Sequence, residues 1–299
     1  MAKGMNRRQF AQCAALGLAA SWAWPAIAQP RQKSRALILA QSYRDDGKLF
    51  LPNTLRDGAL MQQVFQKLAF DEVLLLQDQP ADQTTAELSR FLAGTSADDL
   101  VVTYLAGHGV QIGTENLLML NGANRFISLQ SVMETLQDRS RTVLVFLDAC
   151  RNNPYDGISG SGQISRSVVS RSLAAQPVAL ETVSVQELRG AAQDAAGRLK
   201  PFDLTGSGIK IVFSTDPYNV ALDGATAASR NSPFAQALAR RLLERRSLDD
   251  VIAVTTGDVL AATQSQQSPW SQGSIGRPLF LAGPPLQRNP SRPRFQVPG

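Results

Sequence analysis

The chain has 299 residues, of which 43% are hydrophobic and 18% charged, a balance typical of a globular protein with a substantial core. Two cysteines and one histidine exclude a disulfide framework and argue against zinc sites built from several Cys and His ligands. The formal net charge of +5 falls to +2 without the first 28 residues, which hold three basic and no acidic residues. No basic stripe with interleaved aromatic residues appears, so a nucleic-acid partner is not expected.

Residues 1–28 have the layout of an export signal: a basic start, a short apolar run and an A-x-A cleavage site. These features are Lys3, Arg7 and Arg8; Ala11 to Ala23; and Ala26-Ile27-Ala28. Asn6–Phe10 resembles the twin-arginine motif, which predicts a periplasmic or secreted protein with no stable membrane anchor once the signal is cleaved. An uncleaved anchor helix is the alternative. Cleavage would remove Cys13. The mature chain would then hold one cysteine, Cys150, and one histidine, His108.

Short apolar runs alternate with segments of helical periodicity as far as residue 147. Strands are predicted at 35–40, 71–77, 98–106, 116–120 and 142–147, and helices at 54–68, 84–92 and 128–136. The run at 116–120 is predicted to be an edge strand. This alternation indicates an α/β fold, with a mostly parallel sheet covered by helices on both faces.

The second half of the chain begins with a segment of different composition. Residues 155–208 are rich in Ser, Gly, Ala and Gln, which predicts a long flexible loop with at best a short helix near 185–198. A strand at 209–214, helices at 232–246 and 248–262, and a last strand at 278–281 follow. The domain is therefore placed at 29–282, and the Pro- and Arg-rich tail, 283–299, is predicted to be disordered.

His108 and Cys150 each follow a predicted strand, and His108 stands between Gly107 and Gly109. The carboxyl ends of parallel strands share one rim of a sheet, so the two side chains converge if their strands are neighbours. A thiol beside an imidazole makes a nucleophile with its general base and acid. The backbone N–H groups of Gly109 and Cys150 are candidate oxyanion-hole donors. The alternative is a buried thiol and a polar histidine in a turn.

The order strand, GHG, strand, DAC resembles the caspase-like cysteine peptidases, peptidase family C14, and most of all their bacterial metacaspase branch. The likeness covers about Arg35 to Leu281 through six blocks: Arg56–Ala59, Tyr104–Gln111, Leu147–Pro154, Phe213–Gly224, Ser232–Phe234 and Gln267–Trp270. It implies a three-layer α/β sandwich with a mostly parallel six-stranded sheet. It also implies a cysteine endopeptidase that acts on proteins or peptides, with Cys150 as nucleophile and His108 as its partner.

The resemblance also implies a substrate pocket. In the metacaspase branch two acidic residues line the primary specificity pocket, and the matching positions are Asp57 and Asp148, which implies cleavage after Arg or Lys. Paired carboxylates suit a guanidinium, which can bind them in bidentate fashion. The alternatives are a helix-start carboxylate for Asp57 and a strand-end hydrogen-bonding group for Asp148. No cofactor is expected: some family members need calcium, but Asp45-Asp46 is too small a cluster to predict it.

Two questions stay open at this point. In this family the region matching 155–208 can be cut during maturation, so Arg166, Arg171 and Arg189 are candidate self-cleavage points; an uncut loop is the alternative. The rival to a peptidase is a catalytically silent caspase-like binding or scaffolding module, which need keep neither His108 nor Cys150. A thiol redox protein is disfavoured because the chain has no C-x-x-C pair.

Overall fold

A computed structural model describes residues 32–286, except 48, 113–114, 122–124, 151–162, 169–178, 185–201, 203, 205–207, 217–220 and 227. The expected export signal, residues 287–299 of the tail, the helix predicted at 185–198 and two candidate cleavage points, Arg171 and Arg189, lie outside these residues. Among the helices that are described, none has both the length and the apolar character needed to cross a membrane.

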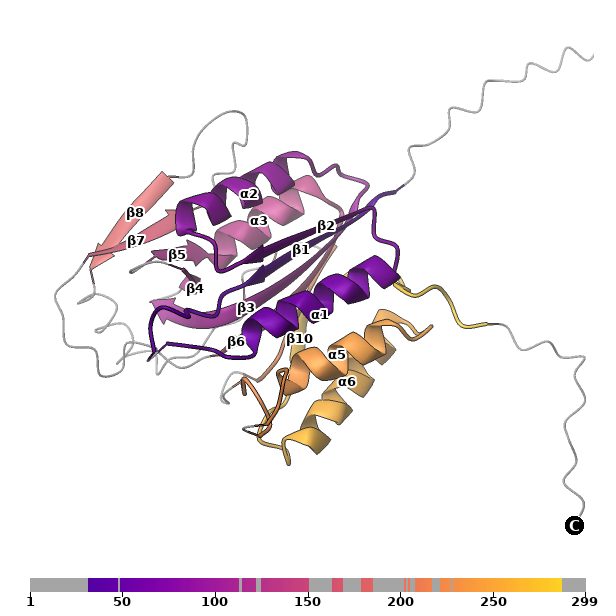
Figure 1. Cartoon of the computed structure of the whole chain (residues 1–299). Helices are drawn as coiled ribbons and strands as arrows, with labels where there is room; N and C mark the ends of the chain where they lie inside the picture. Colours follow the sequence, from indigo (N-terminus) through magenta and orange to yellow (C-terminus); the bar gives the residue numbers. More distant parts are fainter. Residues whose placement is uncertain are drawn as a thin grey trace, which may run out of the picture. The chain divides into compact units, whose positions relative to one another are not determined.

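Six strands form the main sheet of the domain (Figure 1). In spatial order they are β2 (Glu72–Gln77), β1 (Ser34–Ala40), β3 (Leu100–Ile112), β6 (Thr142–Cys150), β9 (Ile209–Phe213) and β10 (Trp270–Ser274). Neighbouring strands run parallel except β10, which runs antiparallel to β9. The inner strands are nearly continuous runs of buried apolar residues because both faces of the sheet are covered.

Five described helices form the two outer layers (Figure 1). One face carries α1 (Thr54–Lys67), α5 (Pro233–Leu242) and α6 (Leu248–Ala262), and the other carries α2 (Ala81–Ala93) and α3 (Leu129–Arg139). Successive strand residues point to opposite faces. Thus Tyr104 packs into the core under α1, α5 and α6, whereas its neighbour Leu105 packs into the core under α2 and α3. The predicted three-layer sandwich with a mostly parallel sheet is confirmed.

A second group of strands extends the sheet beyond β3. The sequence predicted that this strand ends at the glycines around His108, but β3 runs through them to Ile112 and turns back as β4 (Glu115–Leu120). The further strands are β5 (Arg125–Ser128), β7 (Gln163–Val168) and β8 (Ala179–Ser184). Because β4 pairs with β5 as well as with β3, the prediction of an edge strand at 116–120 was wrong.

The prediction of a long loop over 155–208 is wrong at two places, where the chain forms the strands β7 and β8. Their sequences, QISRSV and ALETVS, lack the apolar run that marks a buried strand. They are strands because their backbones pair with each other and, through β7, with β5. The candidate cleavage point Arg166 belongs to β7 and is paired on both sides, with Phe126 and Glu181.

Serine caps begin the helices on both faces. Ser128 and Ser232 accept hydrogen bonds from the N–H groups of Ser131 and Ala235. The last strand, in contrast, lies at Trp270–Ser274 and not at the predicted 278–281. The apolar pattern of 278–281 has another origin, because Leu279 and Leu281 pack against the core under α1, α5 and α6.

Candidate active site

The register of β3 against β6 places His108 beside Cys150. The pairing begins with Leu100 opposite Thr142 and stays in step to the end of β6, where His108 stands opposite Cys150. Adjacent strand backbones lie about 5 Å apart. The two residues that the sequence expected at one rim are therefore neighbours in the backbone. Cys150 ends β6, and His108 lies where the parallel pairing with β6 ends, before β3 continues to Ile112.

The imidazole of His108 is held in one orientation by the chain after β1. Its Nε2 lies 2.8 Å from the carbonyl oxygen of Leu49. A carbonyl only accepts, so the neutral ring carries its proton on Nε2. The other nitrogen, Nδ1, is buried and has no hydrogen-bond partner among the described residues. The lone pair of Nδ1 is therefore available to take a proton.

Burial lowers the pKa of His108 from its ordinary value, and the Leu49 carbonyl and the Asp46 carboxylate oppose that shift. The lowered pKa favours the neutral imidazole near pH 7, which is the form that a general base needs.

Tyr43 supports the same histidine from a second side. Its ring stacks on the imidazole, with the ring centroids 4.9 Å apart. Its hydroxyl accepts a hydrogen bond from the backbone N–H of His108 at 2.9 Å and donates one to the carbonyl of Met119 at 2.9 Å. Gly107, at φ +152°, makes room for this contact, since a Cβ there would lie 2.6 Å from the Tyr43 hydroxyl oxygen. The sequence carries no signal that Tyr43 belongs to the site.

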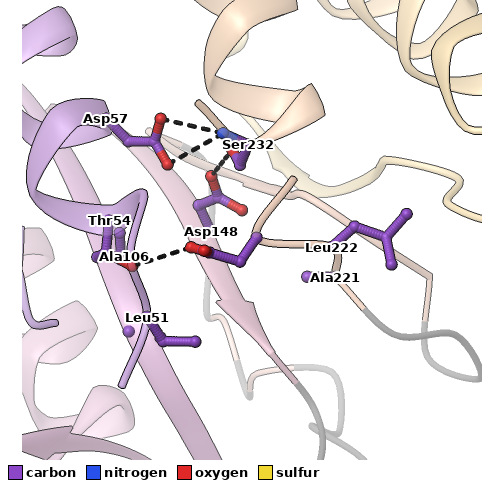
Figure 2. Close-up of a pocket in the computed structure, with 10 residues that line it drawn as sticks. Leu51, Thr54, Asp57, Ala106, Asp148, Ala221, Leu222 and Ser232 are labelled. Atoms are coloured by element: carbon purple, nitrogen blue, oxygen red, sulfur yellow. Dashed lines mark hydrogen bonds between the residues drawn. The ribbon is translucent and has the colours of Figure 1, made fainter. Parts of the chain in front are cut away.

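Asp57 and Asp148 line one small pocket (Figure 2). Asp57 lies in the first turn of α1, and Asp148 lies on β6 two residues before Cys150. Asp57 is buried, whereas Asp148 keeps part of its surface open. The pocket adjoins Gly107, the residue before His108. Its full lining is Leu51, Thr54, Asp57, Ala106, Gly107, Asp148, Ala221, Leu222, Asp223 and Ser232.

Ser232 joins the two carboxyl groups (Figure 2). Its backbone N–H lies 3.1 and 3.2 Å from the two carboxylate oxygens of Asp57, and its hydroxyl donates to Oδ2 of Asp148 at 2.7 Å. The same hydroxyl caps α5, so the positive end of that helix dipole faces both acids. Asn231 donates to Asp57 at 2.7 Å, and the Tyr104 hydroxyl donates to Asp148 at 2.8 Å.

The two acids interact strongly. Burial, and next the charge of Asp148, raise the pKa of Asp57 to about 8, against the opposing hydrogen bonds from Asn231 and Ser232. Burial also raises the pKa of Asp148. Two neighbouring carboxyl groups with little water between them resist double ionisation. The raised pKa of Asp57 favours its protonated form near neutral pH.

Asp223 adds a third carboxyl group to the lining. It accepts hydrogen bonds from the backbone N–H of Asn53 at 3.1 Å and from the Thr54 hydroxyl at 3.4 Å. It thereby ties the segment before α5 to the start of α1, and burial raises its pKa. The sequence assigned neither Asp223 nor Ser232 a role in the pocket, although they lie in the blocks 213–224 and 232–234.

These features define a class: an α/β sandwich with a cysteine and a histidine aligned on adjacent central strands. The caspase-domain model of the peptidase C14 family matches residues 33–280, so the chain belongs to the caspase family of cysteine peptidases. The metacaspase branch stays a prediction.

Two solved structures share the fold. Caspase-1 from Spodoptera frugiperda is 15% identical, with a TM-score of 0.55 over 85% of this chain and 93% of the caspase. Pro-sf-caspase-1 is 17% identical, with a TM-score of 0.53 over 84% of this chain and 90% of its own. At these identities the likeness concerns the fold alone. No curated protein sequence matches the chain significantly.

Proposed function

We propose that this protein is a cysteine endopeptidase that cleaves after arginine or lysine, with Cys150 as the nucleophile and His108 as its general base and acid. One observation carries the proposal: His108 and Cys150 pair across adjacent strands next to a pocket lined by Asp57 and Asp148. Membership of the caspase family supports cysteine-peptidase chemistry. The dyad and the basic specificity are inferred from the residues around this rim.

In the first half of the reaction the Cys150 sulfur attacks the carbonyl carbon of the scissile peptide, and the thiol proton passes to Nδ1 of His108. The oxyanion that forms is stabilised by the backbone N–H groups of Gly109 and Cys150. His108 then gives its proton to the departing amine nitrogen as the C–N bond breaks. A thioester with Cys150 remains.

In the second half His108 removes a proton from water, which attacks the thioester carbon. The C–S bond breaks, the carboxylate product leaves and the proton returns to the thiol. The Leu49 carbonyl keeps Nε2 protonated throughout, so the same nitrogen, Nδ1, handles the proton in both halves. The proposed steps use no metal ion or organic cofactor.

The pocket supplies the specificity. Its carboxyl groups suit a guanidinium, which can make two parallel hydrogen bonds to a carboxylate. A bound cation favours the ionised form of Asp57, whose pKa is raised in the pocket. Substrate affinity should therefore rise with pH through the range in which Asp57 loses its proton, centred on its pKa of about 8.

The test uses fluorogenic peptides that end in Arg, Lys or Asp, under reducing conditions and with and without calcium. The purified chain should hydrolyse the Arg and Lys peptides. Cys150→Ala should abolish turnover, while Cys13→Ala, a matched change at the other cysteine, should leave it intact. Turnover only after Asp would overturn the pocket assignment, and turnover in Cys150→Ala would overturn the mechanism. If the purified chain hydrolyses none of the three peptides, the result would favour a catalytically silent scaffold.

We also propose export through the twin-arginine pathway, on the strength of Arg7, Arg8 and the Ala26-Ile27-Ala28 cleavage site. Replacing both arginines by lysine should keep the protein in the cytoplasm at its uncleaved length. Cell fractionation and mass measurement of the N-terminus would show this. An unchanged distribution between compartments would refute the proposed route.

A further inference from the structure

A buried glutamine lies behind the acidic pocket. Gln267 stands between α6 and β10, and its exposed fraction is 0%. It belongs to a sequence block, 267–270, to which the proposed chemistry gives no role. A fully buried primary amide is retained where its donor and acceptor are both used, so its partners indicate its purpose.

Both ends of the amide bind the backbone of the segment that forms the pocket wall. Nε2 of Gln267 donates to the carbonyl of Ser214 at 2.7 Å, and Oε1 accepts from the N–H of Leu222 at 3.1 Å. Ser214 directly follows β9, while Leu222 lines the pocket. One side chain therefore joins the end of a central strand to the wall of the pocket.

The two points that Gln267 joins lead to the acids of the pocket. The N–H of Ser214 donates to the carbonyl of Leu147, the residue before Asp148, at 2.9 Å. On the other side, Leu222 precedes Asp223, which binds the backbone N–H of Asn53 just before α1. The glutamine thus connects the strand that carries Asp148 with the segment that fixes the start of the helix carrying Asp57.

Gln267 is itself held firmly. Its backbone N–H donates to the Thr263 hydroxyl at 3.1 Å, and that hydroxyl donates to the carbonyl of Val259 at 2.8 Å, at the end of α6. Because the side chain has no exposed surface, it cannot touch a substrate. Its effect on the pocket has to pass through Ser214 and Leu222.

We infer that Gln267 is a positioning residue for substrate recognition, which sets the spacing of the pocket wall by bridging Ser214 and Leu222. This inference rests on the proposed function, because it concerns the pocket for the basic side chain. Without the bridge, the wall that carries Leu222 and Asp223 loses its anchor to the end of β9, although Asp223 keeps its hydrogen bonds to Asn53 and Thr54. The wall can then shift, and the spacing of the carboxyl groups no longer fits a guanidinium. His108 is positioned by other contacts, to Leu49 and Tyr43.

The test compares Gln267→Met with Gln266→Met in the full chain. Methionine keeps the length of the side chain and removes both hydrogen bonds, and Gln266 is an exposed neighbour of the same type. For an Arg-terminated peptide, Gln267→Met should raise KM about 10- to 100-fold, because two hydrogen bonds are lost and two backbone groups are left unpaired. The rate at which iodoacetamide alkylates Cys150 should stay within about twofold of wild type, and Gln266→Met should match wild type in both measurements.

Three outcomes would overturn the inference. The first is a KM for Gln267→Met equal to that of Gln266→Met, with the wild type active. The second is a parallel fall in kcat and in alkylation rate, which would indicate general damage to the site. The third is a wild type that hydrolyses no basic peptide, which would refute the proposed function as well. If Gln267→Met fails to melt cooperatively, Gln267→Asn replaces it, with the same expected KM increase, since the shorter amide cannot reach both partners.

Discussion

Asp57→Asn should make the protein more stable and a poorer peptidase at the same time. The wild-type pocket brings the Asp57 carboxyl close to Asp148 in a buried position, which is unfavourable without a bound cation. Asparagine keeps an oxygen that can accept from Asn231 and Ser232, and it removes the charge.

The stability effect follows from the pKa of Asp57, which is about 8 in the folded chain against an ordinary 3.8. Between these values the folded state binds more protons than the unfolded state, so the free energy of unfolding falls as pH rises. At about 1.4 kcal/mol per pH unit, the wild type should lose up to about 4 kcal/mol relative to Asp57→Asn between pH 5 and pH 8. The variant should therefore be clearly the more stable protein at pH 8.

The binding effect has the opposite sign. Truncating one partner of a buried, hydrogen-bonded charge pair typically costs about 2–5 kcal/mol. Because Asp148 and Asp223 still line the pocket, we expect the lower part of that range, about 2–3 kcal/mol. This corresponds to a fall in kcat/KM for an Arg peptide of roughly 30- to 150-fold.

Urea unfolding at pH 5 and pH 8 and peptide hydrolysis at pH 8 measure the two effects. Asp98→Asn is the matched control, since Asp98 is exposed and forms only a surface ion pair with Arg141 at 2.6 Å; it should change stability by less than about 1 kcal/mol at either pH. A variant that is less stable than wild type by the same amount at both pH values would refute the reasoning. It would mean that the Asp57 carboxylate is already well compensated.

Three further substitutions test the supports of the site. Tyr43→Phe leaves the backbone N–H of His108 without its acceptor and should lower the free energy of unfolding by about 1–3 kcal/mol, measured by urea unfolding, with a lower kcat at unchanged KM. Gly107→Ala should nearly abolish activity because its Cβ collides with the Tyr43 hydroxyl, whereas Gly257→Ala, in an open helical position, should stabilise the chain by about 0.5–1 kcal/mol. Ser232→Ala removes a helix cap and a donor to the acid pair, so thermal melting should show a loss of about 1–2 kcal/mol together with a higher KM for Arg peptides; an unchanged KM would contradict its role in the pocket.

The alternation of apolar runs and helical periods predicted the main sheet and its helices, because burial on both faces leaves a strong local pattern in each strand. The rim position of His108 and Cys150 could also be predicted. Each follows a recognisable strand, and parallel strands end on one side. Their backbone adjacency is confirmed by the register of β3 and β6. Their catalytic roles stay predictions.

Strands that lack a run of apolar residues were not predicted from the sequence. β7 and β8 are polar strands that form through backbone pairing. The last strand, β10, was predicted in the wrong place because Leu279 and Leu281 are apolar for another reason: they pack against the core under α1, α5 and α6. The local sequence indicates secondary-structure propensity and burial, but it does not specify which strands pair with each other.

The sequence by itself determined the α/β class and the two residues at the rim, and resemblance pointed to Asp57 and Asp148. Only the tertiary structure decided what surrounds them. Asp57 meets Ser232 across 175 positions of the chain, and Gln267 meets Ser214 across 53. Such contacts depend on how helices and strands pack, and no local period encodes them. The raised pKa of Asp57 and the bridge from Gln267 to the pocket wall therefore follow from packing.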